Sequence, residues 1–148
     1  MTSSNLTQIE ANRLLELEKR YEGDKMFDYP DLGGHLRLPL ISTDESEAFW
    51  IDITRSYIEL IKNSFQNRAR KVVILARVDI GGAPHRNPDG EEIQSPHIHL
   101  YREGYQDKWA YSLPDSFSDA TNAWQTLQDF MNFCNIIKKP EIERGLST

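Results

Sequence analysis

Residues 71–103, KVVILARVDIGGAPHRNPDGEEIQSPHIHLYRE, decide the fold of this 148-residue chain and contain its most informative polar residues. The first ten are rich in β-branched side chains and end at Gly81-Gly82, which predicts a strong strand over 71–80. Residues 95–103 predict a second strand. If the two strands pair antiparallel through the loop 81–95, their side chains meet in a defined register.

The two strands are expected to place polar side chains on one shared face, because alternate residues of a strand point the same way. His97, His99 and Tyr101 share a face of the second strand, and Arg77 and Asp79 lie on one face at the end of the first. Antiparallel pairing brings these five residues onto one patch. A shift of one residue in register would turn both histidines into the core.

The flanking sequence predicts the remaining elements. Thr7 and Glu10 fit a capping box, followed by a helix that reaches Tyr21. Further strands are expected at 36–40, 48–54, 57–63 and 108–113, with a tight turn at Arg55-Ser56, and a second helix at 118–134. This order predicts an α+β fold with about five mostly antiparallel strands and both helices packed on one face.

Length and composition limit the class of protein. Residues 1–148 are expected to form a single domain, with an ordered core at about 6–138 and frayed termini. The net charge of −6 does not favour binding to nucleic acid or to anionic membranes. No stretch approaches the ~20 apolar residues of a membrane span. The single cysteine, Cys134, is expected to be buried and suits a reducing cytoplasm. The sequence leaves monomer or homodimer open.

Acid–base catalysis is the leading chemistry for the predicted patch. Histidine exchanges protons near neutral pH, so His97 and His99 are the candidate acid and base. Arg77 would stabilise a developing phosphorane charge, Asp79 would orient an imidazole, and Tyr101 would donate a hydrogen bond. Such a set could cleave RNA without a metal or other cofactor, which makes a toxin-like ribonuclease the first hypothesis.

Substrate contacts are expected at the rim of this patch and on a basic segment. Residues 62–71 carry four cationic side chains and no acid, beside an aromatic ring at Phe65. RNA or phosphate contact and a solvated turn are equally weighted interpretations of that segment. The candidate binding residues are His85, Arg102, Lys108, Trp109, Arg68 and Arg70.

Three alternatives remain open. An H-x-H pair on one strand face can chelate Zn²⁺, with Asp79, His85 or Asp89 completing the ligand set. The same surface can bind a protein, as an inhibitor or antitoxin-like partner would. The residues can also form a hydrogen-bonded structural cluster under the loop. Within that loop, Asn87-Pro88-Asp89-Gly90 predicts a type I turn.

The sequence around both predicted strands also resembles a bacterial or phage family of small proteins of unknown function. The matching pieces are RVDIGG, PHRNPDG, PHIHLYREGY and DKWA, and the likeness extends from FWIDITRSYIEL to LQDFMNFCNI. The resemblance implies a bacterial or phage origin and a cytoplasmic location, and it implies no activity. A looser likeness to small toxin-type ribonucleases lies in an RVD strand that precedes a histidine-rich strand.

Overall fold

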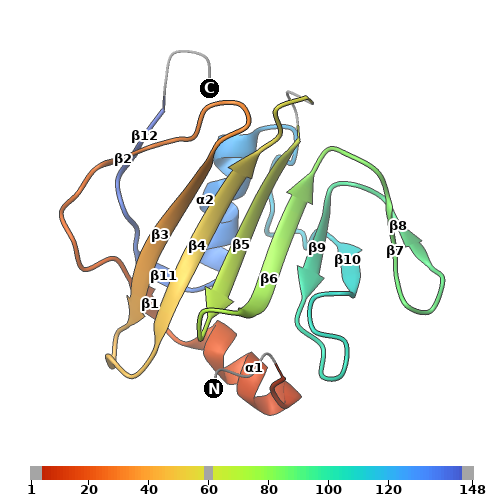
Figure 1. Cartoon of the computed structure of the whole chain (residues 1–148), viewed down its shortest axis with the longest axis horizontal. Coiled ribbons are helices and arrows are strands. Elements are labelled where there is room, and N and C mark those ends of the chain that lie inside the picture. Colours follow the sequence, from red (N-terminus) through yellow and green to blue (C-terminus); the bar gives the residue numbers. More distant parts are fainter. Residues whose placement is uncertain (1–4, 59–61, 145–148) are drawn as a thin grey trace.

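The computed structural model describes residues 5–58 and 62–144 of the chain. The main sheet contains β1 (Lys19–Arg20), β3 (His35–Ser42), β4 (Ala48–Arg55), β5 (Asn63–Ala69), β6 (Val73–Ile80), β9 (His97–Leu100), β10 (Ala110–Ser112) and β11 (Ile136–Lys138). Its order is β10-β9-β6-β5-β4-β3-β1-β11, and every neighbouring pair is antiparallel except β1 with β11 (Figure 1).

Two small sheets flank the main one. One pairs β2 (Phe27–Asp28) with β12 (Ile142–Glu143), and the other pairs β7 (His85–Arg86) with β8 (Glu92–Ile93). The first of these sheets contains a segment of the C-terminal tail, for which fraying was expected. The second lies within the loop 81–95, which is therefore an ordered hairpin beside β9 and β10 (Figure 1).

The expectation of about five strands is wrong, since the main sheet has eight. The strand expected at 57–63 is replaced by β5, which begins where that segment ends and pairs with β4 along its whole length; residues 59–61 lie outside the described part. The basic segment thus contains a strand. Its buried face reads Asn63, Phe65, Asn67, Ala69, and the two asparagines disguised the alternation of apolar and polar residues.

The helices are α1 (Gln8–Glu16) and α2 (Ala123–Phe133), both shorter than expected. The capping box at the start of α1 is confirmed, because the Thr7 side chain accepts a hydrogen bond from the Glu10 amide. The helix does not reach Tyr21, since Leu17 is extended and β1 follows it. Pairing of β1 with two strands outweighs the helical periodicity of its sequence.

One face of the main sheet holds the core. Helix α2 lies behind β4 and β5, and α1 lies at the lower end of the sheet (Figure 1). The buried side chains on this side include Leu14 of α1, Leu38 and Leu40 of β3, Phe49, Ile51 and Ile53 of β4, Phe65 of β5, and Leu127 and Phe130 of α2. Alternation then sends the other residues of the same strands to the opposite face, which is mostly polar.

A lysine is buried inside this core. Lys19 is fully buried, and its Nζ donates to the carbonyl oxygens of Leu15, Leu17 and Cys134 at 2.8, 2.9 and 2.7 Å. The same Nζ lies 4.7 Å from the centre of the Phe49 ring. Burial lowers the pKa of Lys19 to about 8. These carbonyls belong to the C-terminal ends of both helices, so one cation caps the two helices together.

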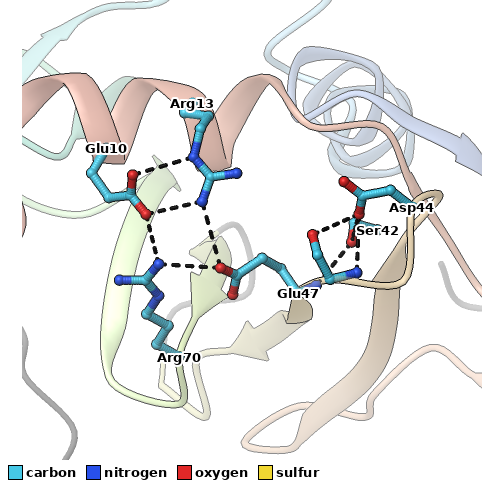
Figure 2. A network of polar contacts seen from close by, with 7 residues as sticks. Glu10, Arg13, Ser42, Asp44, Glu47 and Arg70 are labelled. Carbon is cyan, nitrogen blue, oxygen red and sulfur yellow. Dashed lines mark hydrogen bonds and ion pairs between the residues drawn. The ribbon is translucent and has the colours of Figure 1, made fainter.

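Ion pairs fasten α1 to two turns of the sheet (Figure 2). Arg70, in the β5–β6 turn, binds Glu10 at 2.6 Å and Glu47 at 3.1 Å, and Arg13 binds the same two carboxylates. Hydrogen bonds from Arg13 lower the pKa of Glu10 to about 2. Next to this network, Asp44 accepts hydrogen bonds within its own turn. Arg70 therefore has a structural role at the end of the sheet where α1 packs.

Candidate functional site

Strands β6 and β9 pair antiparallel and place the predicted residues on one face. Arg77 lies opposite His99, and Asp79 lies opposite His97. Directly opposite residues of an antiparallel pair share a face, so these four side chains lie on the polar face of the sheet. Gly81 and Gly82 then turn the chain away from β6 with φ angles of 74° and 82°, which other residues rarely adopt.

Each of these four residues belongs to one of two rows of polar side chains that run across neighbouring strands of the sheet. One row places Ser64 beside Asp79, and the Ser64 hydroxyl donates to Asp79 Oδ1 at 3.0 Å. The same row begins at His35, four strands away from His97. His35 is exposed and, at about 4.8 Å per strand, lies about 19 Å from His97.

Both central histidines are buried, although they face away from the apolar core. His97 is 2% exposed and His99 is 1% exposed. The hairpin at 81–95 brings the ring of His85 to 4.5 Å from that of His99, and the rings of His97 and His99 are 5.0 Å apart. Three of the four histidines of the chain therefore form one cluster, in which His85 is the most exposed.

The Nδ1 atom of each buried imidazole is hydrogen-bonded to a backbone carbonyl. His99 Nδ1 lies 2.8 Å from the oxygen of Asp107, and His97 Nδ1 lies 3.2 Å from that of Gln94. A carbonyl oxygen only accepts, so both Nδ1 atoms carry the proton. In a neutral imidazole, the lone pair then lies on Nε2.

Both Nε2 atoms approach the same carboxylate oxygen. Asp79 Oδ2 lies 3.3 Å from His97 Nε2 and 3.2 Å from His99 Nε2. Arg77 also contacts Asp79, and it donates to the carboxylate of Asp107 at 2.8 Å. Burial raises the pKa of Asp79, but hydrogen bonds from His97 and His99 and the charge of Arg77 together hold it well below its usual range.

This arrangement needs a cation among the three groups. Two neutral imidazoles that donate through Nδ1 would direct two lone pairs at a carboxylate, which also carries only lone pairs. A proton on Nε2 or a metal ion removes the conflict. The ligand atoms of Asp79, His97 and His99 all lie within 4.8 Å of one another, which makes them a set that could bind a metal.

Two of the three separations between the ligand atoms have the spacing of metal ligands. A charge-assisted N–H···O bond is typically about 2.7–2.9 Å, shorter than the contacts at Asp79. Two ligands of one ion at ~2.1 Å are about 3.0 Å apart at a right angle and about 3.4 Å apart at a tetrahedral angle. The observed separations of 3.2 and 3.3 Å fall between these two values. The carbonyl bond at each Nδ1 is also the outer support that metal-binding histidines usually have.

Asn87 fixes the hairpin that covers the cluster. Its side chain is buried and forms two hydrogen bonds with the backbone of Ala110 in β10, at 2.8 and 3.0 Å. The turn predicted at 87–90 is present, with a bond from the Gly90 amide to the Asn87 carbonyl. His85 is fixed separately, because its Nε2 lies 2.7 Å from the Lys108 carbonyl. The ring of His85 is thereby held over the buried pair.

Tyr101 does not join the cluster. It is buried in the core, and its hydroxyl binds the backbone of Leu6, before α1. Strand β9 ends at Leu100, so the alternation that places Tyr101 beside the histidines stops one residue too early. Arg102 and Trp109 form a stack of their own, with the guanidinium 4.1 Å from the ring centre.

The remaining predicted contact residues are dispersed. Arg68 lies on the polar face and is paired with Asp52 at 2.5 Å, and Arg70 belongs to the network at α1. Lys108 is exposed and reaches the cluster only through its backbone carbonyl. Asp89 accepts a hydrogen bond from Glu91 in its own turn and is absent from the metal-ligand set. Among the described residues, the charges of Arg68 and Arg70 are thus compensated by carboxylates.

Sequence reasoning missed three residues that hold the cluster together. They are Ser64, Asn87 and Asp107, and the last binds both His99 and Arg77. Ser64 belongs to the unrecognised strand β5. The alternation Ser64, Gln66, Arg68 against Phe65 and Ala69 was the signal that could have located it. Asp107 and Asn87 act across loops, where no periodicity exists.

The chain belongs to a family of unknown function, DUF6978. The model of that family matches residues 6–136, which confirms the resemblance to an uncharacterised family. No curated protein matches the chain, and no solved structure matches it. Within the described part, no helix is long and apolar enough to cross a membrane.

Proposed function

We propose that this protein binds one divalent transition-metal ion of the Zn²⁺ class through Asp79, His97 and His99. The observation that carries the proposal is the hydrogen bonding of the two imidazoles. Each donates through Nδ1 to a carbonyl, and each presents Nε2 to the same carboxylate oxygen. Two imidazoles and a carboxylate are ligands that Zn²⁺ accepts.

The charge of the site supports a divalent ion. Asp79 and Asp107 carry two negative charges, and Arg77 is the single permanent cation that contacts both. The cluster with neutral histidines is therefore negative by one charge, and it lies beside imidazoles from which water is largely excluded. A buried net charge is costly unless it is compensated, and a metal ion supplies the compensation.

Hydrolysis is the reaction that such a site would support. Three protein ligands leave a position for water, and a zinc ion lowers the pKa of bound water to near 7. His85 stands over the pair, and its Nε2 faces a carbonyl, so the lone pair of the neutral ring lies on Nδ1. We therefore assign His85 to accept a proton from the water bound at this position. A substrate would reach the site from the side of Asp79, whose side chain is 26% exposed.

The metal-independent, toxin-like ribonuclease stays a prediction, as do a protein-binding role and a cytoplasmic location. Burial of His97 and His99 weighs against direct contact between these imidazoles and a polymer. An inhibitor or antitoxin-like partner would have to dock over His85 and the hairpin instead.

Metal titration tests the proposal. Protein purified without an affinity tag and stripped with EDTA should bind Zn²⁺ at one equivalent in calorimetry, and Co²⁺ should give a visible absorption spectrum. Asp79→Asn and His99→Ala should abolish both signals. His35→Ala is the matched control, because His35 lies in the same polar row but outside the cluster. Failure of the wild type to bind one equivalent, or equal loss in His35→Ala, would refute the site.

RNA serves as the second probe. RNA cleavage by the wild type in EDTA, lost in His97→Ala, would favour the metal-independent ribonuclease over the metal site. Cleavage that requires Zn²⁺ and is lost in His85→Ala would join the two hypotheses in one hydrolytic centre.

A further inference from the structure

A cavity of about 810 Å³ lies where β6 ends and β9 begins, on the side of the sheet opposite to the histidine cluster. Ile80 and Pro96 line it, whereas their chain neighbours Asp79 and His97 face the cluster. The other walls come from β5, the segment before β3 and the first turn of α2. Cavities of this size bind small molecules.

The arginines in this cavity differ from the others. Seven of the ten arginines form ion pairs with carboxylates. The remaining three form none with any described residue, and two of them, Arg55 and Arg144, line the cavity. In a chain with a net charge of −6, acidic partners are plentiful, so two guanidiniums that pair with no carboxylate of residues 5–58 and 62–144 favour an anion as the ligand of this cavity.

One carboxylate also lines the cavity, and one of its two oxygens is engaged within its own turn. Asp119 Oδ1 accepts hydrogen bonds from the backbone amide and the hydroxyl of Thr121 at 3.1 and 2.5 Å. These bonds lower the pKa of Asp119. The lining thus carries two guanidiniums against one carboxylate.

The first turn of α2 adds donors on the same wall. Asn122 caps the helix by accepting from the Gln125 amide, and Thr126 makes the first backbone bond within the helix. The amides of Ala123 and Trp124 precede those two and have no acceptor inside the helix. Both residues line the cavity beside the arginines.

Two aromatic rings form another part of the lining. The rings of Tyr29 and Trp124 meet edge to face at 6.2 Å. Arg144 lies 4.7 Å from the centre of Trp124, and Arg55 lies 5.7 Å from that of Tyr29 and donates to the Pro30 carbonyl at 3.0 Å. A ligand with a flat, weakly polar body next to its anionic group would contact both kinds of surface.

We propose that this cavity binds a small organic phosphate with a planar ring, the chemistry of a nucleoside monophosphate. The phosphate binds Arg55, Arg144 and the first amides of α2, and the ring lies against Tyr29, Trp124 and Ile80. Arginine suits a phosphate because its planar guanidinium donates two parallel hydrogen bonds. This site is separate from the metal site and does not depend on it.

The probe is AMP, tested with metal-free protein in EDTA, so that no metal–phosphate contact contributes. Calorimetry and tryptophan fluorescence should detect one equivalent of AMP, and adenosine and inorganic phosphate should each bind at least about tenfold more weakly. Arg144→Gln should weaken AMP binding by about tenfold, the loss of one charge-assisted pair. Arg102→Gln is the matched control, since Arg102 is the third arginine without an ion pair in the described part of the chain and also stacks on a tryptophan, outside the cavity.

The outcomes separate the parts of the proposal. If AMP, GMP, CMP and UMP all fail to bind below about 1 mM, the site is refuted. Equal affinity for inorganic phosphate and AMP would refute the role of the ring. Equal weakening by Arg102→Gln and Arg144→Gln would refute the location. Zinc titration of the same variants after removal of EDTA is independent of these results, so the two proposals fail or succeed separately.

Discussion

Lys19 and the histidine cluster are two buried polar centres with opposite hydrogen-bond balance. The ammonium of Lys19 has three donors, and three carbonyls accept from them. With neutral imidazoles, the described groups of the histidine cluster offer more acceptors than donors, because both Nε2 lone pairs then face Asp79. A closed set of bonds indicates a structural role, whereas an open set is the basis of the metal site that we propose. The difference can be tested by changing each centre separately.

The largest effect is expected at the closed centre. Lys19→Met should leave three helix-terminal carbonyls without donors and reduce the free energy of unfolding by about 3–5 kcal/mol. Urea denaturation followed by circular dichroism measures this loss. Lys25→Met is the control, since Lys25 is exposed. A Lys19→Met variant as stable as the wild type would mean that the carbonyls are satisfied by other groups.

Zn²⁺ should stabilise the open centre. At a free concentration of 100 times the dissociation constant, one bound ion raises the free energy of unfolding by about 2.7 kcal/mol. Thermal unfolding of the stripped protein with and without Zn²⁺ measures the shift. Asp79→Asn should unfold at one temperature in both conditions, whereas Lys25→Met should respond as the wild type does. A shift of equal size in Asp79→Asn would place the ion elsewhere.

Substitution of Asn87, which holds the hairpin over the cluster, should have an intermediate effect on stability. Asn87→Ala removes both side-chain bonds to Ala110 and should cost about 1–3 kcal/mol, because buried backbone groups are left unpaired. Hydrogen exchange should increase in residues 83–93 and in β10. Asp89→Ala, on the same turn but exposed, is the comparison. Unchanged exchange in Asn87→Ala would show that other contacts hold the hairpin.

The smallest effect concerns acid in the metal-free protein. A carboxyl whose pKa is lower in the folded state contributes stability that is complete above its unfolded value, near 3.9, and is lost as the pH falls toward the folded value. The stability contributed by Asp79, whose pKa is lowered in the folded protein, should be lost in this way as the pH falls. Asp79→Asn should therefore lose less stability than the wild type between pH 5 and pH 3, with exposed Asp115→Asn as the control. Parallel pH profiles in the wild type and Asp79→Asn would contradict the assignment.

The sequence located the histidine cluster more accurately than it described the sheet. The shared face of Arg77, Asp79, His97 and His99 followed from alternation and antiparallel pairing, because one face of each strand is strongly apolar. Strand β5 escaped detection, since its buried face includes Asn63 and Asn67. Strands β1 and β11 are only two and three residues long, and such segments have no measurable period.

Burial of the histidines was also beyond the reach of the sequence. The cover is made by His85, the Lys108 backbone and the bonds of Asn87 to Ala110, contacts that join segments more than 20 residues apart. The chemistry changes as a result. Exposed imidazoles would favour proton exchange with a substrate, whereas buried ones with fixed Nδ1 atoms favour a bound ion.

The third bond of Lys19 joins it to a carbonyl 115 residues further along the chain. During synthesis, the ammonium emerges from the ribosome long before Cys134, and at roughly 5–20 residues per second this interval lasts several seconds. The parallel pairing of β1 with β11 has the same delay. Helix α1 and Lys19 thus complete their contacts with the core only after nearly all of the sheet has been synthesised. The segments around Lys19, β1 and β11 therefore fold last and together.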